Sequence, residues 1–156
     1  MPRLVEMDRH VSLFEQMEEQ VGSVVLINTF TVEPEEAEHL QEAWASDAAF
    51  MKQQPGFIST QLHRGIGGSS VFVNYAVWES VEHFKRAFTN PEFQAKMQDY
   101  PPSAEASPHL LKKVAVPGIC VEWVPLLRLP LGRSFPERRF RPSRAPNHRG
   151  ALLGHW

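Results

Sequence analysis

The sequence predicts an α+β fold of the ferredoxin-like, split βαβ kind, with an antiparallel sheet and two helices on one of its faces. Three observations predict it. Four short stretches alternate apolar and polar residues, two amphipathic helical stretches stand between them, and a glycine-rich turn joins the second and third strands. The order is therefore βαββαβ. The 156 residues, 42% of them hydrophobic, suffice for one compact domain with additions but not for two.

The first 22 residues predict an amphipathic helix that precedes the sheet domain. Apolar side chains recur every three or four positions. They are Leu4, Met7, Val11, Phe14, Met17 and Val21. Gly22 and Ser23 end the pattern, and the helix needs a surface on which to dock.

The first strand and helix of the βαββαβ unit occupy residues 24–32 and 33–53. A run of β-branched and aliphatic residues predicts the strand. Pro34 in the first turn, followed by Glu35 and Glu36, favours a helix start. The 3.6-residue period then continues through Leu40, Ala43, Trp44, Asp47, Phe50 and Met51.

A hairpin follows, with strands at residues 57–63 and 70–78 and a turn that contains three glycines. Ser80 is the expected N-cap of the next helix, which runs to about Phe88 and restarts at Asn90-Pro91 through Tyr100. Three prolines in residues 101–108 predict a loop there. The last strand is expected at residues 117–124, which places the sheet domain at residues 23–127.

The charge is distributed unevenly along the chain. Residues 1–127 hold 9 Lys and Arg against 17 Asp and Glu, whereas residues 128–156 hold 7 Arg and one Glu. The Arg- and Pro-rich tail predicts an extended or disordered arm. It has few interleaved aromatic residues, so a solvated or partner-docked arm is favoured over one that binds nucleic acid.

The rest of the composition bears on location and assembly. An acidic N-terminal segment argues against a signal peptide, and the single Cys120 cannot form an internal disulfide, so a cytoplasmic location is expected. The apolar runs are strand-sized, so no membrane span is expected. Both faces of the predicted sheet are apolar, and a second copy that packs sheet to sheet is the expected cover. A homodimer is therefore predicted.

Several catalytic motifs are absent from the sequence, including the Walker A loop, GxSxG, HExxH and CxxC. The informative residues are instead Asn74 and Trp78, which share one face of a strand because its side chains alternate. His63 on the preceding strand lies near them if the hairpin is tight, and Asn28 is a polar residue within an apolar strand. Trp78 could equally be a core residue, and His63 could simply be exposed. A small-molecule pocket between helices and sheet is the functional interpretation.

Residues 24–97 resemble the antibiotic biosynthesis monooxygenase family of dimeric α/β barrels. The run PGFIST, the downstream His63 and the run VNYAVWES resemble its cofactor-free, quinone-forming members of the actinorhodin type. The resemblance implies a homodimer that uses O₂ to oxidise an aromatic polycyclic phenol, anthrone or quinol to a quinone, with no flavin, haem or metal. It covers neither residues 1–22 nor residues 128–156.

The resemblance also implies roles for residues. Asn74 and Trp78 match the pocket asparagine and tryptophan that stabilise the substrate anion, and His63 matches the pocket histidine. The remaining candidates are expected to bind substrate. They are Asn28, Phe57, Phe84 and Phe88. Phe84 stands where those relatives have a tyrosine, and it cannot donate a proton.

Two alternatives follow from the same resemblance. A haem-degrading branch shares an asparagine at the position of Asn28, but Ala87 and Met97 stand where its tryptophan and histidine would be, so haem degradation is disfavoured. The other alternative is a non-catalytic dimer of this fold that binds a ligand or a partner.

Overall fold

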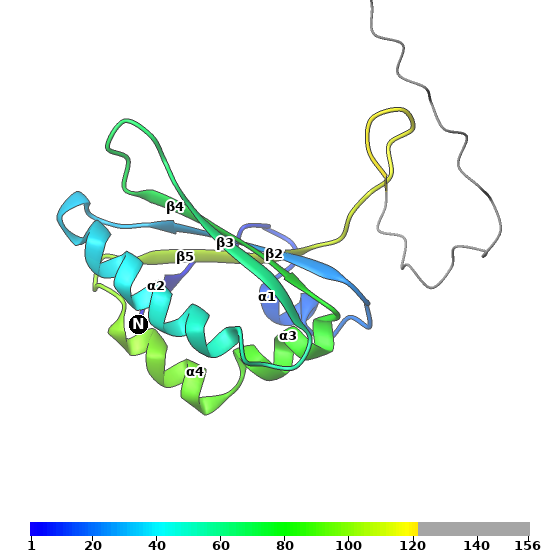
Figure 1. The fold of residues 1–156 in the computed structure, drawn as a ribbon, viewed down its shortest axis with the longest axis horizontal. Helices are drawn as coiled ribbons and strands as arrows, with labels where there is room; N and C mark the ends of the chain where they lie inside the picture. The colour runs from blue at the N-terminus through cyan, green and yellow to red at the C-terminus, as the bar shows by residue number, and fades with distance from the viewer. Residues whose placement is uncertain (122–156) are drawn as a thin grey trace, which may run out of the picture. The chain divides into compact units, whose positions relative to one another are not determined.

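A computed structural model describes residues 1–121 of the chain. Five strands form one open sheet in the order β1-β5-β2-β4-β3. The strands are β1 Arg3–Leu4, β2 Val24–Thr31, β3 Phe57–Arg64, β4 Val71–Trp78 and β5 Glu105–Leu111. The α-helices lie on one side of the sheet (Figure 1) and are α1 Leu13–Gln16, α2 Ala37–Met51, α3 Val81–Phe88 and α4 Pro91–Lys96. The 3-10 helices are η1 Pro34–Glu36 and η2 Met97–Asp99. The predicted ferredoxin-like α+β fold is confirmed, and the sheet does not close into a barrel.

The helix starts follow the capping residues that the sequence contains. The Ser80 hydroxyl accepts a hydrogen bond from the backbone N–H of His83 at the start of α3, and the Asn90 side chain accepts one from Glu92 at the start of α4. Pro91 occupies the first turn of α4, where no N–H is needed. The one long helical stretch after Trp78 is thus two helices that meet at Asn90.

A close approach explains the glycine of the Pro55-Gly56-Phe57 run. Gly56 has φ +79°, and a Cβ at this position would lie only 2.2 Å from the His83 ring. Both the left-handed backbone and the contact exclude a larger side chain. The turn after α2 is thereby packed against α3, and β3 starts at the next residue, Phe57.

The expected helix over residues 4–21 was wrong in its extent. Only Leu13–Gln16 is α-helical, and Arg3–Leu4 instead forms a strand parallel to β5. The Asp8 carboxylate accepts hydrogen bonds from the backbone of His10 and Val11, which holds a turn in place of a helix. Ser12 then starts α1 with a complete capping box that involves Glu15.

The last strand was also predicted in the wrong place, because β5 spans Glu105–Leu111 and so overlaps the loop that was expected at residues 101–108. The backbone groups of Ala106 and Leu110 point away from β2, toward Val5 and the Gln16 side chain. Pro108 has the same parity, so its missing N–H would also point away from β2. Where the last strand was expected to begin, at residue 117, the described chain forms only an isolated bridge between Val116 and Cys120 on either side of a turn. The predicted arm at residues 128–156 lies outside the described residues.

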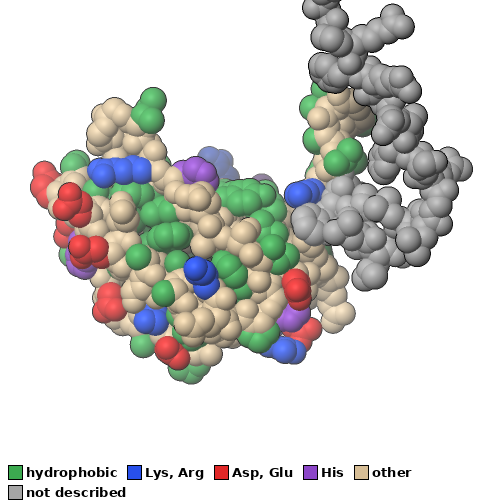
Figure 2. Space-filling view, viewed as in Figure 1, with side chains coloured by type: hydrophobic (Ala, Val, Ile, Leu, Met, Phe, Trp, Pro, Cys, Tyr) green, Lys and Arg blue, Asp and Glu red, His purple; other side chains and the backbone are tan. Residues whose placement is uncertain are grey.

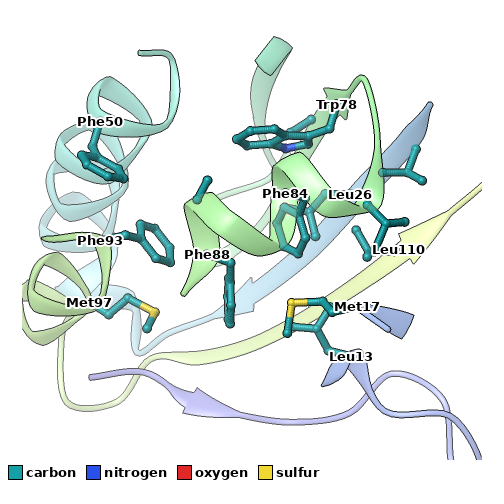
Figure 3. Close-up of a cluster of buried hydrophobic side chains, with 14 residues drawn as sticks. Leu13, Met17, Leu26, Phe50, Trp78, Phe84, Phe88, Phe93, Met97 and Leu110 are labelled. Carbon is teal, nitrogen blue, oxygen red and sulfur yellow. The ribbon is translucent and has the colours of Figure 1, made fainter. Parts of the chain in front are cut away.

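Two hydrophobic clusters fill the space between the sheet and the helices. We name the first the Trp78 cluster (Figure 3): Leu13, Met17, Val24, Leu26, Phe50, Ala76, Trp78, Val81, Phe84, Ala87, Phe88, Phe93, Met97 and Leu110. The second, the Tyr100 cluster, consists of Phe30, Val32, Ala37, Leu40, Ala43, Phe72, Tyr100, Ala104 and Ala106. Within residues 1–121 no helix is long and apolar enough to cross a membrane.

Candidate functional site

A cavity lies between the inner face of the sheet and helices α2, α3 and α4. Its lining is apolar except for four polar side chains, Asn28, Asp47, Thr60 and Asn74. The remaining lining residues are Leu26, Trp44, Ala48, Met51, Phe57, Ala76, Trp78, Phe84, Phe88, Phe93 and Pro108. The cavity has a volume of about 50 Å³, space for one or two water molecules.

Asn74 lies at the centre of the sheet wall of this cavity. The β2–β4 register places it directly opposite Asn28, and both side chains point toward the helices. The Thr60 hydroxyl donates a hydrogen bond of 2.6 Å to the Asn74 amide oxygen. This bond fixes the orientation of the amide and leaves its two N–H donors for another group.

Trp78 and Asn28 each carry a buried polar atom whose hydrogen-bonding capacity is unused. The Trp78 side chain is only 1% exposed, and within residues 1–121 neither its indole N–H nor the Asn28 amide oxygen has a hydrogen-bond partner. A buried polar group without a partner costs a few kcal/mol, so such groups are rare in stable cores. One unused donor and one unused acceptor at the same cavity are typical of a binding site.

Aromatic rings form the remaining walls. Phe57 and Phe84 contact the Trp78 ring edge-on, with centroid distances of 5.4 and 5.8 Å. Phe88 follows Phe84 at 5.5 Å, and Phe93 follows Phe88 at 5.6 Å. Figure 3 shows the rings of Trp78, Phe84, Phe88 and Phe93 gathered between the helices and the sheet. The walls suit a flat apolar molecule.

Asp47 contributes a buried acid from α2. Its side chain is 8% exposed and accepts a hydrogen bond from the Tyr100 hydroxyl. Burial raises the pKa of Asp47 to about 7, although Tyr100 and the Lys96 charge act in the opposite direction. The same burial and the neighbouring carboxylate raise the pKa of Tyr100, which therefore stays protonated.

His63 does not line the cavity. The β3–β4 register places Leu62 opposite Asn74 and His63 opposite Val73, so the His63 side chain belongs to the other face of the sheet. An irregularity between Phe57 and Ser59 sets this register. The His63 ring nitrogen Nδ1 lies 3.3 Å from the Val73 carbonyl oxygen. The expectation that His63 shares a cavity with Asn74 and Trp78 is therefore not met.

Two open grooves run between α2 and β3 on either side of Trp44. One, of about 810 Å³, shares Trp44, Ala48, Phe57 and Thr60 with the cavity lining. The other, of about 610 Å³, is lined by Leu62, Arg64 and acidic residues of α2. Apolar side chains are exposed over the region of α2 and β3 (Figure 2). Trp44, Met51 and Phe57 are only partly buried, so their movement would join the cavity to the grooves.

The structure thus brings together six of the seven residues that the sequence pointed to, Asn28, Phe57, Asn74, Trp78, Phe84 and Phe88. Sequence reasoning missed Asp47, Thr60 and Trp44. A signal for Asp47 was present, because this residue stands among the apolar positions of its helix. Thr60 carried no such signal, since a threonine in a strand is ordinary.

The open sheet, the helices on one of its faces and the partly polar cavity between them define a ferredoxin-like α+β protein with a candidate small-molecule site. Residues 23–99 match the antibiotic biosynthesis monooxygenase family, and they include all seven predicted site residues. A crystal structure of a candidate monooxygenase from Shewanella loihica PV-4 is 31% identical, with a TM-score of 0.52 over 63% of this chain and 100% of that chain. The chain belongs to the antibiotic biosynthesis monooxygenase family.

Two of the matches, one to a curated sequence and one to a solved structure, come from Streptomyces nogalater. Deoxynogalonate monooxygenase is 39% identical over 70 residues, which are 45% of this chain and 58% of that relative. The crystal structure of SnoaB, a cofactor-independent oxygenase, is 29% identical, with a TM-score of 0.54 over 62% of this chain and 98% of that chain.

Proposed function

We propose that this protein is a cofactor-independent monooxygenase that oxidises an aromatic polycyclic phenol, anthrone or quinol with O₂ to a quinone. The observation that carries the proposal is the aromatic cavity in which the Trp78 N–H and the Asn28 oxygen lack protein partners within residues 1–121, beside the oriented amide of Asn74. The likeness to SnoaB and deoxynogalonate monooxygenase supports it.

The proposed reaction needs no redox cofactor because the substrate itself supplies the electrons that reduce O₂. An anthrone CH₂ group and O₂ give a C=O group and water, so atoms and electrons balance without a cofactor. Loss of a proton yields an enolate, which reduces O₂ and becomes a hydroperoxide that loses water. The protein must exclude solvent, accept a proton and stabilise the oxyanion.

The cavity residues fit these tasks. In the proposed complex the N–H groups of Asn74 and Trp78 donate hydrogen bonds to the substrate oxyanion, and the Asn28 oxygen accepts one from a ring hydroxyl. Phe57, Phe84 and Phe88 contact the ring faces and edges. The present cavity is too small for a tricyclic substrate, so binding must displace Trp44, Met51 or Phe57 toward the grooves.

Oxygen consumption tests the proposal. Purified protein treated with chelator and freed of flavin is mixed with a panel of anthrones and hydroquinones, and O₂ uptake is compared with that of the uncatalysed oxidation. We expect turnover that yields the quinone. Binding without turnover across the panel would contradict the proposal and favour the alternative, a non-catalytic ligand-binding protein.

The proposal extends to a homodimer. The helices all cover one face of the sheet, and the opposite face presents a row of partly or fully exposed apolar side chains, among them Ile27, Val73, Tyr75 and Val77. Tyr75 remains 37% exposed. A second copy related by a two-fold axis would bring the same surface against itself. Sedimentation analysis should give twice the chain mass, and a monomer at micromolar concentration would contradict this assembly.

A cytoplasmic location is part of the same proposal. It is supported by Cys120, which is free and exposed. Fractionation of producing cells would test it, and recovery in the membrane or secreted fraction would contradict it.

A further inference from the structure

The cavity has one ionisable side chain among the described residues that line it, the carboxyl group of Asp47. Asn28, Thr60, Asn74 and Trp78 can donate or accept hydrogen bonds, but none of them accepts a proton at neutral pH. The proposed reaction begins with the loss of a proton from an apolar, buried ring. A base that reaches this ring is therefore required, and His63 lies on the other side of the sheet.

We infer that Asp47 is the catalytic base of the proposed monooxygenase and that Tyr100 is the positioning residue that holds its carboxylate at the cavity wall. The inference rests on the proposed function and goes beyond it, because it assigns the proton transfer to α2 rather than to the sheet.

The Asp47 carboxylate can carry out every proton transfer of the reaction. Asp47 takes a proton from the substrate carbon, and the electron pair stays on the ring as an enolate. The enolate reduces O₂ and binds it as a peroxide anion, which recovers the proton from Asp47. Asp47 then removes the second proton from the same carbon while the O–O bond breaks, and it protonates the hydroxide that leaves. The products are the ketone of the quinone and one water molecule.

The surroundings of Asp47 suit this role. Tyr100, which follows η2, donates a hydrogen bond to one carboxylate oxygen, Oδ2. Lys96 on α4 is the nearby cation, and its ammonium group also donates to the Ser46 hydroxyl at 3.2 Å. The cavity-lining residues of β2, β4 and α3 are uncharged. Because burial raises the pKa of Asp47 to about 7, the group can both take up and release a proton near neutrality.

The alternative is a structural role, in which Asp47 only satisfies the buried Tyr100 hydroxyl. The two roles differ in the pH dependence of turnover. A base must be ionised, so kcat/KM should rise with pH through about 7 in the wild type. Tyr100→Phe removes a hydrogen bond that lowers this pKa and should move the rise to higher pH. A structural role predicts a loss that is equal at all pH values.

Substitutions of Asp47 measure how much its carboxylate contributes to kcat. With dithranol as substrate, Asp47→Asn should lower kcat by about 100-fold or more and leave KM nearly unchanged, since the amide keeps the shape of the wall. Asp47→Glu should keep part of the activity. Asp99→Asn, a matched change at an exposed position one residue before Tyr100, should have no effect. Wild-type kcat in Asp47→Asn would overturn the inference.

A second readout separates this inference from the proposed function. In the absence of O₂ a catalytic base still exchanges the hydrogens of the dithranol CH₂ group with solvent deuterium, and mass spectrometry measures this exchange without any oxidation. The wild-type protein and Asp99→Asn should accelerate the exchange, whereas Asp47→Asn should not. Equal acceleration by Asp47→Asn would overturn the role of Asp47. Exchange that depends on Asp47, without O₂ uptake on any anthrone, would instead contradict only the monooxygenase proposal.

Discussion

The Trp78 cluster lines the cavity directly, whereas the Tyr100 cluster reaches it through the hydrogen bond from Tyr100 to Asp47. The two clusters also differ in how their buried polar atoms are bonded. In the Tyr100 cluster the phenol donates to Asp47, and Phe30 stacks on the Tyr100 ring at 5.6 Å. In the Trp78 cluster the indole N–H has no hydrogen-bond partner within residues 1–121. The Tyr100 hydroxyl is therefore satisfied within the chain, whereas the Trp78 N–H is free to donate to a further molecule.

The unpartnered polar atoms of the cavity lower the stability of the free protein, and they are the atoms that a bound substrate would satisfy. A buried tryptophan donor and a buried asparagine acceptor without partners destabilise the free protein, and in the proposed complex each of them gains a hydrogen bond with the substrate. In the Tyr100 cluster the buried hydroxyl already has a partner, and its hydrogen bond orients the Asp47 carboxyl group. Stability and activity should therefore respond in opposite ways to changes on the two sides.

The largest expected effect is the loss of activity in Asn74→Ala. Removal of one preorganised oxyanion donor typically lowers kcat by about 100- to 1,000-fold. Stability should change little, because Thr60 is partly buried at the cavity and can donate to water instead. Steady-state O₂ uptake with an anthrone gives the first quantity and thermal unfolding gives the second. Turnover within threefold of the wild type would remove Asn74 from the proposed mechanism.

Leu40→Ala should have the reverse profile. Leu40 is 0% exposed at the centre of the Tyr100 cluster, so its truncation should lower the free energy of unfolding by about 3 kcal/mol. Leu40 does not line the cavity, so kcat of the folded fraction should stay close to that of the wild type. Denaturant unfolding measures the loss. A large fall in kcat with unchanged stability would show that the two clusters do not divide these roles.

The sequence predicted the sheet side of this comparison better than the helix side. Strand alternation placed Asn74 and Trp78 on one face without any tertiary information, and the register then added Asn28. His63 was misplaced because an irregularity at residues 57–59 shifts β3 by one position, which turns every later side chain to the other face. Periodicity cannot report such a shift.

The errors at the two ends of the described chain have one cause. The helix expected at residues 4–21 and the loop expected at residues 101–108 were both judged locally. The structure forms strands there because β5 pairs with β2 and β1 pairs with β5. Pro108 is tolerated only because its backbone nitrogen points away from β2. Asp47 was visible on an apolar helix face, but its partner Tyr100 lies 53 positions away.

Stability against pH should reveal the charge of Asp47. Its pKa is raised in the folded protein from 3.8 to about 7, so the folded state holds a proton that the unfolded state releases between these values. The wild type should therefore lose about 2 to 3 kcal/mol of stability as the pH rises from 5 to 8. Asp47→Asn cannot ionise and should lack this loss, with Asp99→Asn as the control. Identical pH profiles of wild type and Asp47→Asn would mean that Asp47 is ionised throughout.

The smallest effect is the sharpest test of the contrast between the two clusters. Tyr100→Phe deletes a hydroxyl that has a partner, so it should cost about 1 to 2 kcal/mol of stability. Trp78→Phe deletes an N–H that has none in the described chain, and relief of that buried donor offsets the lost ring volume, so the cost should stay below about 1 kcal/mol. Turnover should nevertheless fall about tenfold in Trp78→Phe, since Phe cannot donate to the oxyanion. A Trp78→Phe variant less stable than Tyr100→Phe would contradict this expectation. It would mean that the indole N–H stabilises the free protein and is not left over for substrate.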